Sequence, residues 1–162
     1  PNTVTDIVHG AFQKCSELIS IEIPDSVTRI GNGAFDGCSK LSSINIPNSV
    51  REIGDGAFHE CDSLKSITIP VSVNKIGIGA FKNCTNLDSL EFAKRESTNP
   101  INIDTYAFEN TALTSVVIPD WMKEIPEGLF YKNSKLEAIY LPATIEKINY
   151  RNYPFFVDIR ID

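Results

Sequence analysis

The chain of 162 residues has few of the side chains that most often carry chemistry: one Trp, one Met, two His and four Cys. Its 15 Lys and Arg stand against 21 Asp and Glu, and the longest basic run is Lys94-Arg95. Because phosphate binding needs clustered positive charge, we expect no nucleic acid partner at a net charge of −6. No apolar run approaches the roughly 18–20 residues that span a bilayer, so no membrane-spanning segment is expected.

A unit of 23 residues recurs along most of the sequence. Three copies are nearly identical in pattern: IEIPDSVTRIGNGAFDGCSKL at 21–41, INIPNSVREIGDGAFHECDSL at 44–64 and ITIPVSVNKIGIGAFKNCTNL at 67–87. The Ile-x-Ile part alternates inward and outward as a short strand does. A Pro, which cannot donate to a strand ladder, follows at once and ends each strand: Pro24, Pro47, Pro70, Pro119 and Pro142.

One unit cannot bury its apolar side alone, whereas stacked units can, which is the principle of a solenoid. We therefore predict a single domain over residues 1–162, with about six and a half units and a parallel strand ladder on one face. The apolar columns would join into one core, centred on a recurring Phe: Phe12, Phe35, Phe58, Phe81, Phe108 and Phe130.

The two ends and one insertion depart from the period. The first residues, Pro1-Asn-Thr-Val, align one period before Pro24-Asp-Ser-Val, so the chain begins where a strand should just have ended. No signal peptide or dedicated cap is visible, although the short turn 149–154 would partly cap the last strand. We expect a segment of a longer array; a complete mature protein is the alternative. The insertion at 93–100 is expected to form a surface loop, either at a binding side or simply tolerated.

The unit L-x-x-I-x-I-P-x-S-V-x-x-I-G-x-G-A-F-x-x-C resembles the BspA-like (Treponema pallidum-type) leucine-rich repeat over nearly the whole chain. The resemblance implies a curved, right-handed, horseshoe-like leucine-rich-repeat solenoid of the α/β class. A parallel sheet would line its concave face, with short turns, irregular or 3-10 segments on the convex face. Members are mostly surface or secreted proteins of host-associated bacteria and some parasitic protists, and are associated with adhesion. The resemblance thus implies an extracellular or cell-surface location.

The cysteines lie at one position of the unit, 23 residues apart: Cys15, Cys38, Cys61 and Cys84. A tetrahedral zinc site needs ligands that converge on one point, whereas one Cys per coil forms a line. Disulfides between adjacent coils remain possible, because the coil spacing can fall within disulfide reach. The preferred interpretation is four reduced, buried packing residues. Thr111 and Asn133 take this position in later coils without visible compensation.

No residues suggest catalysis or a bound cofactor. His9 and His59 lie in different, variable columns that we expect to be solvated, and no Cys-His or Ser-His-Asp arrangement is suggested. We expect neither an enzyme nor a cofactor. The candidate partner is a protein, in line with the resemblance a host extracellular-matrix or cell-surface protein.

The outward column of the predicted sheet is where a partner would be recognised. It is polar at first and becomes apolar and aromatic toward the C-terminus: Glu22, Asn45, Thr68, Glu91, Val117, Tyr140 and Arg160. Interface anchors favour Tyr, Trp and Arg. The predicted binding residues are therefore the end of this column with the nearby Trp: Glu91, Val117, Trp121, Tyr140 and Arg160. Scattered surface apolar residues without a role are the alternative. The function hypotheses are a non-enzymatic adhesion module or a structural spacer that presents another domain.

Overall fold

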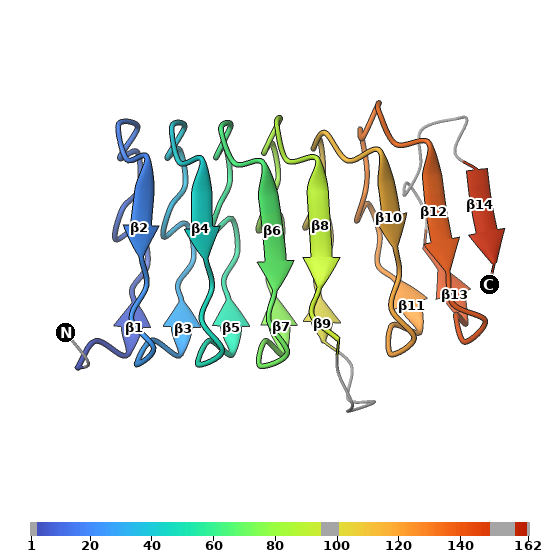
Figure 1. Ribbon diagram of the computed structural model, residues 1–162, viewed down its shortest axis with the longest axis horizontal. Helices are drawn as coiled ribbons and strands as arrows, with labels where there is room; N and C mark the ends of the chain where they lie inside the picture. The colour runs from blue at the N-terminus through green and yellow to red at the C-terminus, as the bar shows by residue number, and fades with distance from the viewer. Residues whose placement is uncertain (1–2, 95–100, 150–157, 162) are drawn as a thin grey trace.

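The computed structural model describes residues 3–94, 101–149 and 158–161, and these form a solenoid of parallel strands (Figure 1). The longer strands follow one another along one side, here called the long-strand face: β2 (Ser20–Glu22), β4 (Ser43–Asn45), β6 (Ser66–Ile69), β8 (Ser89–Phe92), β10 (Ser115–Val117), β12 (Ala138–Leu141) and β14 (Asp158–Ile161). β14 is the seventh strand that the Ile-x-Ile pattern predicts at the C-terminus.

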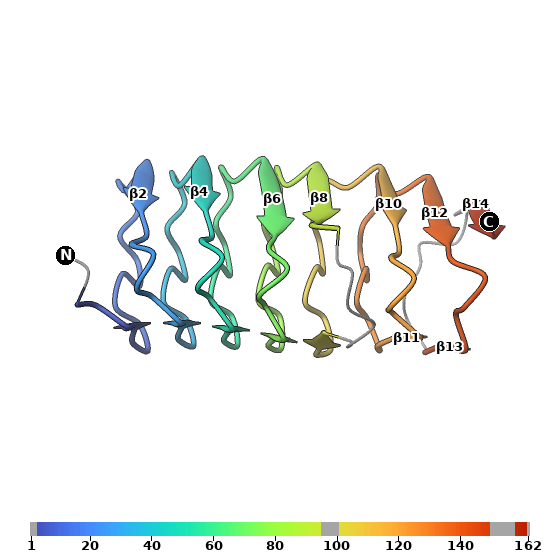
Figure 2. The same ribbon diagram turned by 60° about the horizontal axis from the view of Figure 1, so that its bottom comes forward.

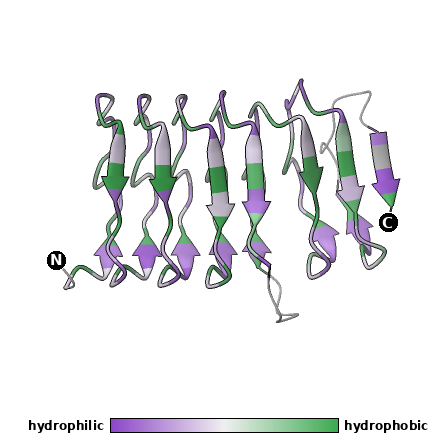
Figure 3. Ribbon diagram, viewed as in Figure 1, coloured by the Kyte–Doolittle hydropathy of each residue, from purple (hydrophilic) through white to green (hydrophobic). Residues whose placement is uncertain are grey.

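Strand register follows the sequence period. Ser20 pairs with Ser43, and Ile21 with Ile44, one unit further on. Hydrophobic and hydrophilic residues alternate along these strands (Figure 3), because every second side chain enters the core. The parallel, register-matched stacking that the repeat predicts is thereby confirmed.

The opposite side holds a second, narrow set of two-residue strands, here called the short-strand face (Figure 2). They are β1 (Asp6–Ile7), β3 (Arg29–Ile30), β5 (Glu52–Ile53), β7 (Lys75–Ile76), β9 (Asn102–Ile103), β11 (Glu124–Ile125) and β13 (Lys147–Ile148). The first five form one parallel sheet. Short turns follow these strands as expected, but the expected 3-10 segments are not found among the described residues, since this stretch of the unit is extended. The described residues include no helix long and apolar enough to cross a membrane.

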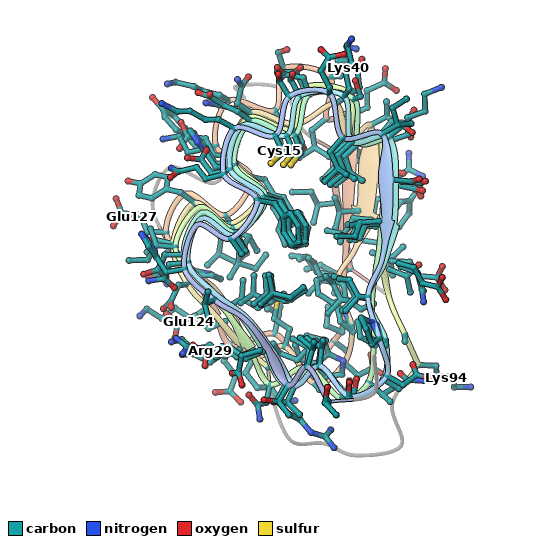
Figure 4. The ribbon with its side chains drawn as sticks, turned by 90° about the vertical axis from the view of Figure 1, so that its left-hand side faces the viewer. Cys15, Arg29, Lys40, Lys94, Glu124 and Glu127 are labelled. Carbon is teal, nitrogen blue, oxygen red and sulfur yellow. The ribbon has the colours of Figure 1, made fainter. Side chains whose placement is uncertain are left out.

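A column of Phe rings runs through the core between the two faces. Successive rings from Phe12 to Phe108 stack with centroids 5.1–5.2 Å apart and nearly parallel planes. Phe130 continues the column at 6.3 Å with a larger tilt. Seen down the solenoid, the side chains of successive coils superpose (Figure 4). This continuous core is what the Gly-Ala-Phe repeat predicts.

The cysteine column lies beside the Phe column, and all four thiols are free. Cys38, Cys61 and Cys84 are buried as predicted, but Cys15 is exposed because no described coil covers it. Each buried thiol donates to the carbonyl oxygen of the Phe one coil earlier; for Cys61 and Phe35 the distance is 3.2 Å. Burial raises the pKa of Cys38 to about 11 and that of Cys84 to about 12.

Thr111 and Asn133, which replace Cys in later coils, compensate each other, contrary to the expectation from sequence. Asn133 is fully buried, and its Oδ1 accepts from the Thr111 amide at 2.6 Å and from its hydroxyl at 3.1 Å. Its Nδ2 donates to Phe108 O at 3.1 Å, as a thiol does elsewhere. The coil of Thr111 has one residue fewer between Phe108 and Leu113. Asn133 supplies the acceptor that the amide of this shortened turn needs.

Both sheets are interrupted close to the insertion: the long-strand face between β8 and β10, which flank it, and the short-strand face one step later, since β7 still pairs with β9 across it. Among the described residues, no ladder joins β8 to β10 or β9 to β11, and β8 and β10 stand visibly apart (Figure 1). On the short-strand face, neighbouring coils use an amide such as Gly77 N, which donates to Ile53 O at 2.8 Å. Asp104 N makes the same bond to Ile76 O at 2.9 Å in the next unit, but Pro126 takes this position one unit later and has no N–H to give to Ile103. The core continues across this step while the sheets separate.

Candidate functional site

Three predicted binding residues lie side by side at the C-terminal end of the long-strand face. Val117 on β10, Tyr140 on β12 and Arg160 on β14 occupy one register column. The Arg160 guanidinium lies 5.5 Å from the centroid of the Tyr140 ring and donates to its hydroxyl at 3.3 Å. Arg160 Nε also donates to Asp158 at 2.8 Å, and this contact raises the pKa of Arg160. Val117 is 67% exposed, so the column offers an uncovered apolar side chain next to an aromatic ring held by a cation.

Glu91 precedes Val117 in the same column but stands on the other side of the interruption. β8, which carries it, pairs with β6 and not with β10. Glu91 is exposed and lines a groove between β8 and β10 together with Val117. The structure thus brings Glu91, Val117, Tyr140 and Arg160 onto one surface, here called the C-terminal patch.

Trp121 does not belong to this surface, which corrects the interpretation of its position in sequence. Its side chain is only 8% exposed and packs edge-on against Phe92, with centroids 5.5 Å apart. Phe92 in turn makes an edge contact with Phe108, with centroids 6.4 Å apart. The other strands have Ile, or Leu in β12, at the position of Phe92. The larger ring and the indole fill the core at the interruption, so Trp121 has a packing role there.

The outward column and the Ser column of the remaining long-strand face are polar, although Ile19, just before β2, is exposed. A column of Ser residues lies beside the binding column and is exposed from Ser20 to Ser115. At β12 the column changes to Ala138, which is buried. The insertion that we predicted to form a surface loop follows β8 in the sequence, but its residues 95–100 lie outside the described part of the chain. Most of the predicted cap at 149–154 also lies outside it. The C-terminal patch therefore differs from the rest of the face in its chemistry.

A hydrogen-bonded row of side chains crosses several coils on the turns after Gly-Ala-Phe. Gln13 Nε2 donates to Asp36 Oδ2 at 2.8 Å, and His59 Nδ1 lies 2.8 Å from Asp36 Oδ1. Asn83 Nδ2 lies 3.3 Å from His59 Nε2. Partial burial acts to raise the pKa of Asp36, but the hydrogen bonds from Gln13 and His59 outweigh it and lower that pKa. His59 is thus not the solvated side chain that we predicted, whereas His9 is exposed.

The same row contains a buried charge that the sequence reasoning missed. The Glu109 side chain is 4% exposed and lies between two lysines: its Oε2 is 2.8 Å from Lys82 Nζ and its Oε1 is 3.4 Å from Lys132 Nζ. Glu109 follows Lys82 in one repeat column, so a search for opposite charges one unit apart would have found the pair. Ion pairs one unit apart also cross the short-strand face, as between Lys75 and Glu52 at 3.0 Å. These contacts tie neighbouring coils together.

Within the described residues, one trio could bring carboxylate and imidazole ligands to a metal ion: Asp36, His59 and Glu60. Both ring nitrogens of His59 already have neighbours, Asp36 on one side and Asn83 on the other. The trio is therefore best explained as part of the row that joins the coils.

Comparisons with known proteins agree with the geometry. The profile of the BspA type leucine rich repeat region matches residues 1–99 and 53–156, with six copies. The crystal structure of a leucine-rich-repeat protein from T. pallidum superposes with a TM-score of 0.75 at 33% identity, over 96% of this chain and 66% of that one.

Two further crystal structures are similar. A leucine-rich cell surface protein from Faecalibacterium prausnitzii has a TM-score of 0.64 at 25% identity, over 99% of this chain and 59% of that one. The pneumococcal vaccine antigen PcpA has a TM-score of 0.72 at 27% identity, over 88% of this chain and 37% of that one. The chain thus spans less than two thirds of each of these structures. A search of curated proteins gave no match. From its repeat, its solenoid and these matches, the chain belongs to the BspA-type leucine-rich-repeat family.

Proposed function

We propose that the chain is a non-enzymatic protein-binding module that acts in adhesion and recognises its partner through the C-terminal patch of the long-strand face. The observation that carries this proposal is the exposed Val117 beside the Tyr140–Arg160 pair. Aromatic and Arg side chains are enriched at protein interfaces, and a few such anchors supply most of the binding free energy. The long-strand face is the one that we expect to be concave.

The contrast along the column supports this choice of site. At the N-terminal end the same positions hold Glu22, Asn45 and Thr68, which are polar and exposed. A face that only needed to stay solvated would have no reason to change character at β10. An exposed Val next to a Tyr held by an Arg gives a partner both an apolar contact and hydrogen-bonding groups.

The proposed location is the cell surface or the extracellular space. One similar structure is described as a cell surface protein and another as a vaccine antigen. By the same relationship, the proposed partner is a host extracellular-matrix or cell-surface protein.

The test is a binding assay of the purified chain against immobilised host matrix and serum proteins. The double variant Val117→Ser with Tyr140→Ala should fold normally, because Val117 is exposed and Tyr140 is only partly buried, and should lose binding at least about tenfold, as loss of an interface anchor does. The control is Asn45→Ala with Thr68→Ala, which changes the same column at β4 and β6 and should bind as the unmodified chain does. Equal binding by both double variants would contradict the choice of patch.

A structural spacer is the second candidate function. It is favoured by the continuous Phe column, in which rings stack at nearly constant spacing from Phe12 to Phe108 and which makes adjacent coils rigid with respect to each other. In that case no host protein would bind, and substitutions along the whole column would have no effect on attachment of the larger protein that carries the chain.

A further inference from the structure

The groove between β8 and β10 has a mixed lining. Its apolar part comes from Leu90, Phe92, Val117 and Pro119, and its polar part from Asp88, Ser89, Glu91 and Ser115. Leu90 and Phe92 are partly buried and pack against the core, so their outer surfaces stay open to the groove. Among the described residues, neither β4 and β6 nor β8 and β10 are joined by a ladder, but β4 still packs closely against β6 whereas β8 does not pack closely against β10. The step from β8 to β10 therefore lacks the close strand contact that seals the rest of the face.

Two carboxylates border the same groove. Asp88 precedes β8 and Glu91 lies within it; both are exposed, and neither has an ion-pair partner within 4.0 Å among the residues that the structure describes. Lys65 is the neighbour of Asp88 one coil earlier, without an ion pair to it, and Glu137 adds a further exposed carboxylate two strands on. The groove therefore combines several apolar side chains with two unpaired carboxylates.

We propose that this groove takes an apolar side chain from an extended protein segment that carries Lys or Arg two residues before and two residues after it. This inference rests on the proposed function, since it names the chemistry of the partner at the same surface. In an extended segment, residues two apart point to the same side, so both cations would face the carboxylates while the apolar side chain enters the groove. Asp88 and Glu91 are three residues apart, or about 10 Å along a strand, a span that two flexible Lys side chains can bridge.

Trp121 provides a direct signal of occupancy. It is the only Trp of the chain, and its ring lies edge-on against Phe92, which lines the groove. A side chain that packs on the outer surface of Phe92 should therefore change the fluorescence of the indole beneath it. The reporter needs no label and reads the groove rather than the rest of the patch.

The experiment titrates the chain with the acetylated, amidated peptide Lys-Ser-Leu-Ser-Lys up to millimolar concentration and follows Trp fluorescence. We expect a saturable change that weakens with added salt, because exposed charges are screened within about 8 Å at 0.15 M ionic strength. The peptides Glu-Ser-Leu-Ser-Glu and Lys-Ser-Ser-Ser-Lys should give no saturable change. Asp88→Asn and Glu91→Gln should each weaken binding about two- to fivefold, as single exposed ion pairs do. Glu22→Gln, in the same column at β2, is the matched control and should leave binding unchanged.

Each of three peptide results would overturn the inference: equal binding of the glutamate peptide, an equal effect of Glu22→Gln and Glu91→Gln, or no saturable change with any peptide. A fourth result concerns the chain without peptide. A fluorescence change that depends on protein concentration without peptide would show that a second copy of the chain occupies the groove, which also overturns it. Failure here is distinct from failure of the proposed function, because the host-protein assay with Val117 and Tyr140 variants uses neither the peptide nor the carboxylates.

Discussion

Replacement of Phe58 by Ala tests whether the ring column holds the coils together. Phe58 is fully buried, and its ring stacks on Phe35 at 5.2 Å and on Phe81 at 5.1 Å. Truncation of a core Phe to Ala lowers the free energy of unfolding by about 3–5 kcal/mol. Stacked aromatic pairs add about 0.5–1.5 kcal/mol beyond burial. Because Phe58→Ala removes two such pairs, we expect a loss near the upper end, about 4–5 kcal/mol.

Urea unfolding measures this loss. With a slope of about 2 kcal/mol per M urea, a loss of 4 kcal/mol lowers the midpoint by about 2 M. Circular dichroism and Trp121 fluorescence should be followed together, because repeat arrays can lose the cooperativity that a single free energy assumes.

The matched control is Phe12→Ala at the first described coil. Phe12 is only partly buried and stacks on one neighbour, Phe35, so we expect roughly half the loss at Phe58. Equal losses at the two positions, or a loss below about 1 kcal/mol at Phe58, would refute the view that stacking between coils carries the stability of the core.

Three further changes test the contacts between coils. Gly54→Ala should lower the free energy of unfolding by about 1–3 kcal/mol, because the added Cβ would lie 2.6 Å from the backbone nitrogen of Asn32; thermal unfolding measures it. Asn133→Cys, which restores the repeat pattern, should nevertheless destabilise by about 1–3 kcal/mol, because it leaves the buried amide of Thr111 without its acceptor; urea unfolding measures it. At pH 8, Cys15 should react with a thiol reagent well before the three buried cysteines, whose raised pKa values keep them as neutral thiols; the count of modified thiols over time measures it.

The controls separate these effects from general damage. Ser134→Ala, at an exposed position next to Asn133, should leave the urea midpoint unchanged, and a matching loss there would contradict the role of the Asn133 acceptor.

The raised thiol pKa values also set a pH dependence of the free energy of unfolding. A thiol that is neutral when folded stabilises the chain below the pKa of an unfolded Cys, about 8.5, and this contribution is lost as the pH rises toward the folded values of about 11 and 12. Fast reaction of all four thiols at pH 8 would contradict the burial.

The period of the sequence determined the solenoid, the strand register and the Phe column. Each follows from spacing within one unit: the Ile-x-Ile alternation defines a strand, the Pro after it ends the strand, and a constant 23 residues places equivalent side chains above one another. Val117 and Tyr140, 23 residues apart, could be placed side by side for the same reason, whereas Arg160, only 20 residues after Tyr140, is placed beside it by the alternation within its own strand. Which strands lie next to each other in such a ladder follows from the repeat alone, because consecutive units stack in chain order.

Only the tertiary structure decided what happens where the period fails. Trp121 stands in a column of small hydroxyl residues and could be interpreted as exposed, but Phe92 from the neighbouring coil gives it a buried partner. The Thr111–Asn133 contact depends on a shortened turn in one coil and a side chain from the next. The groove between β8 and β10 exists because the strands separate at this step while the Phe column continues through the core. These features arise from contacts between unlike coils, which a repeating pattern within one coil cannot specify.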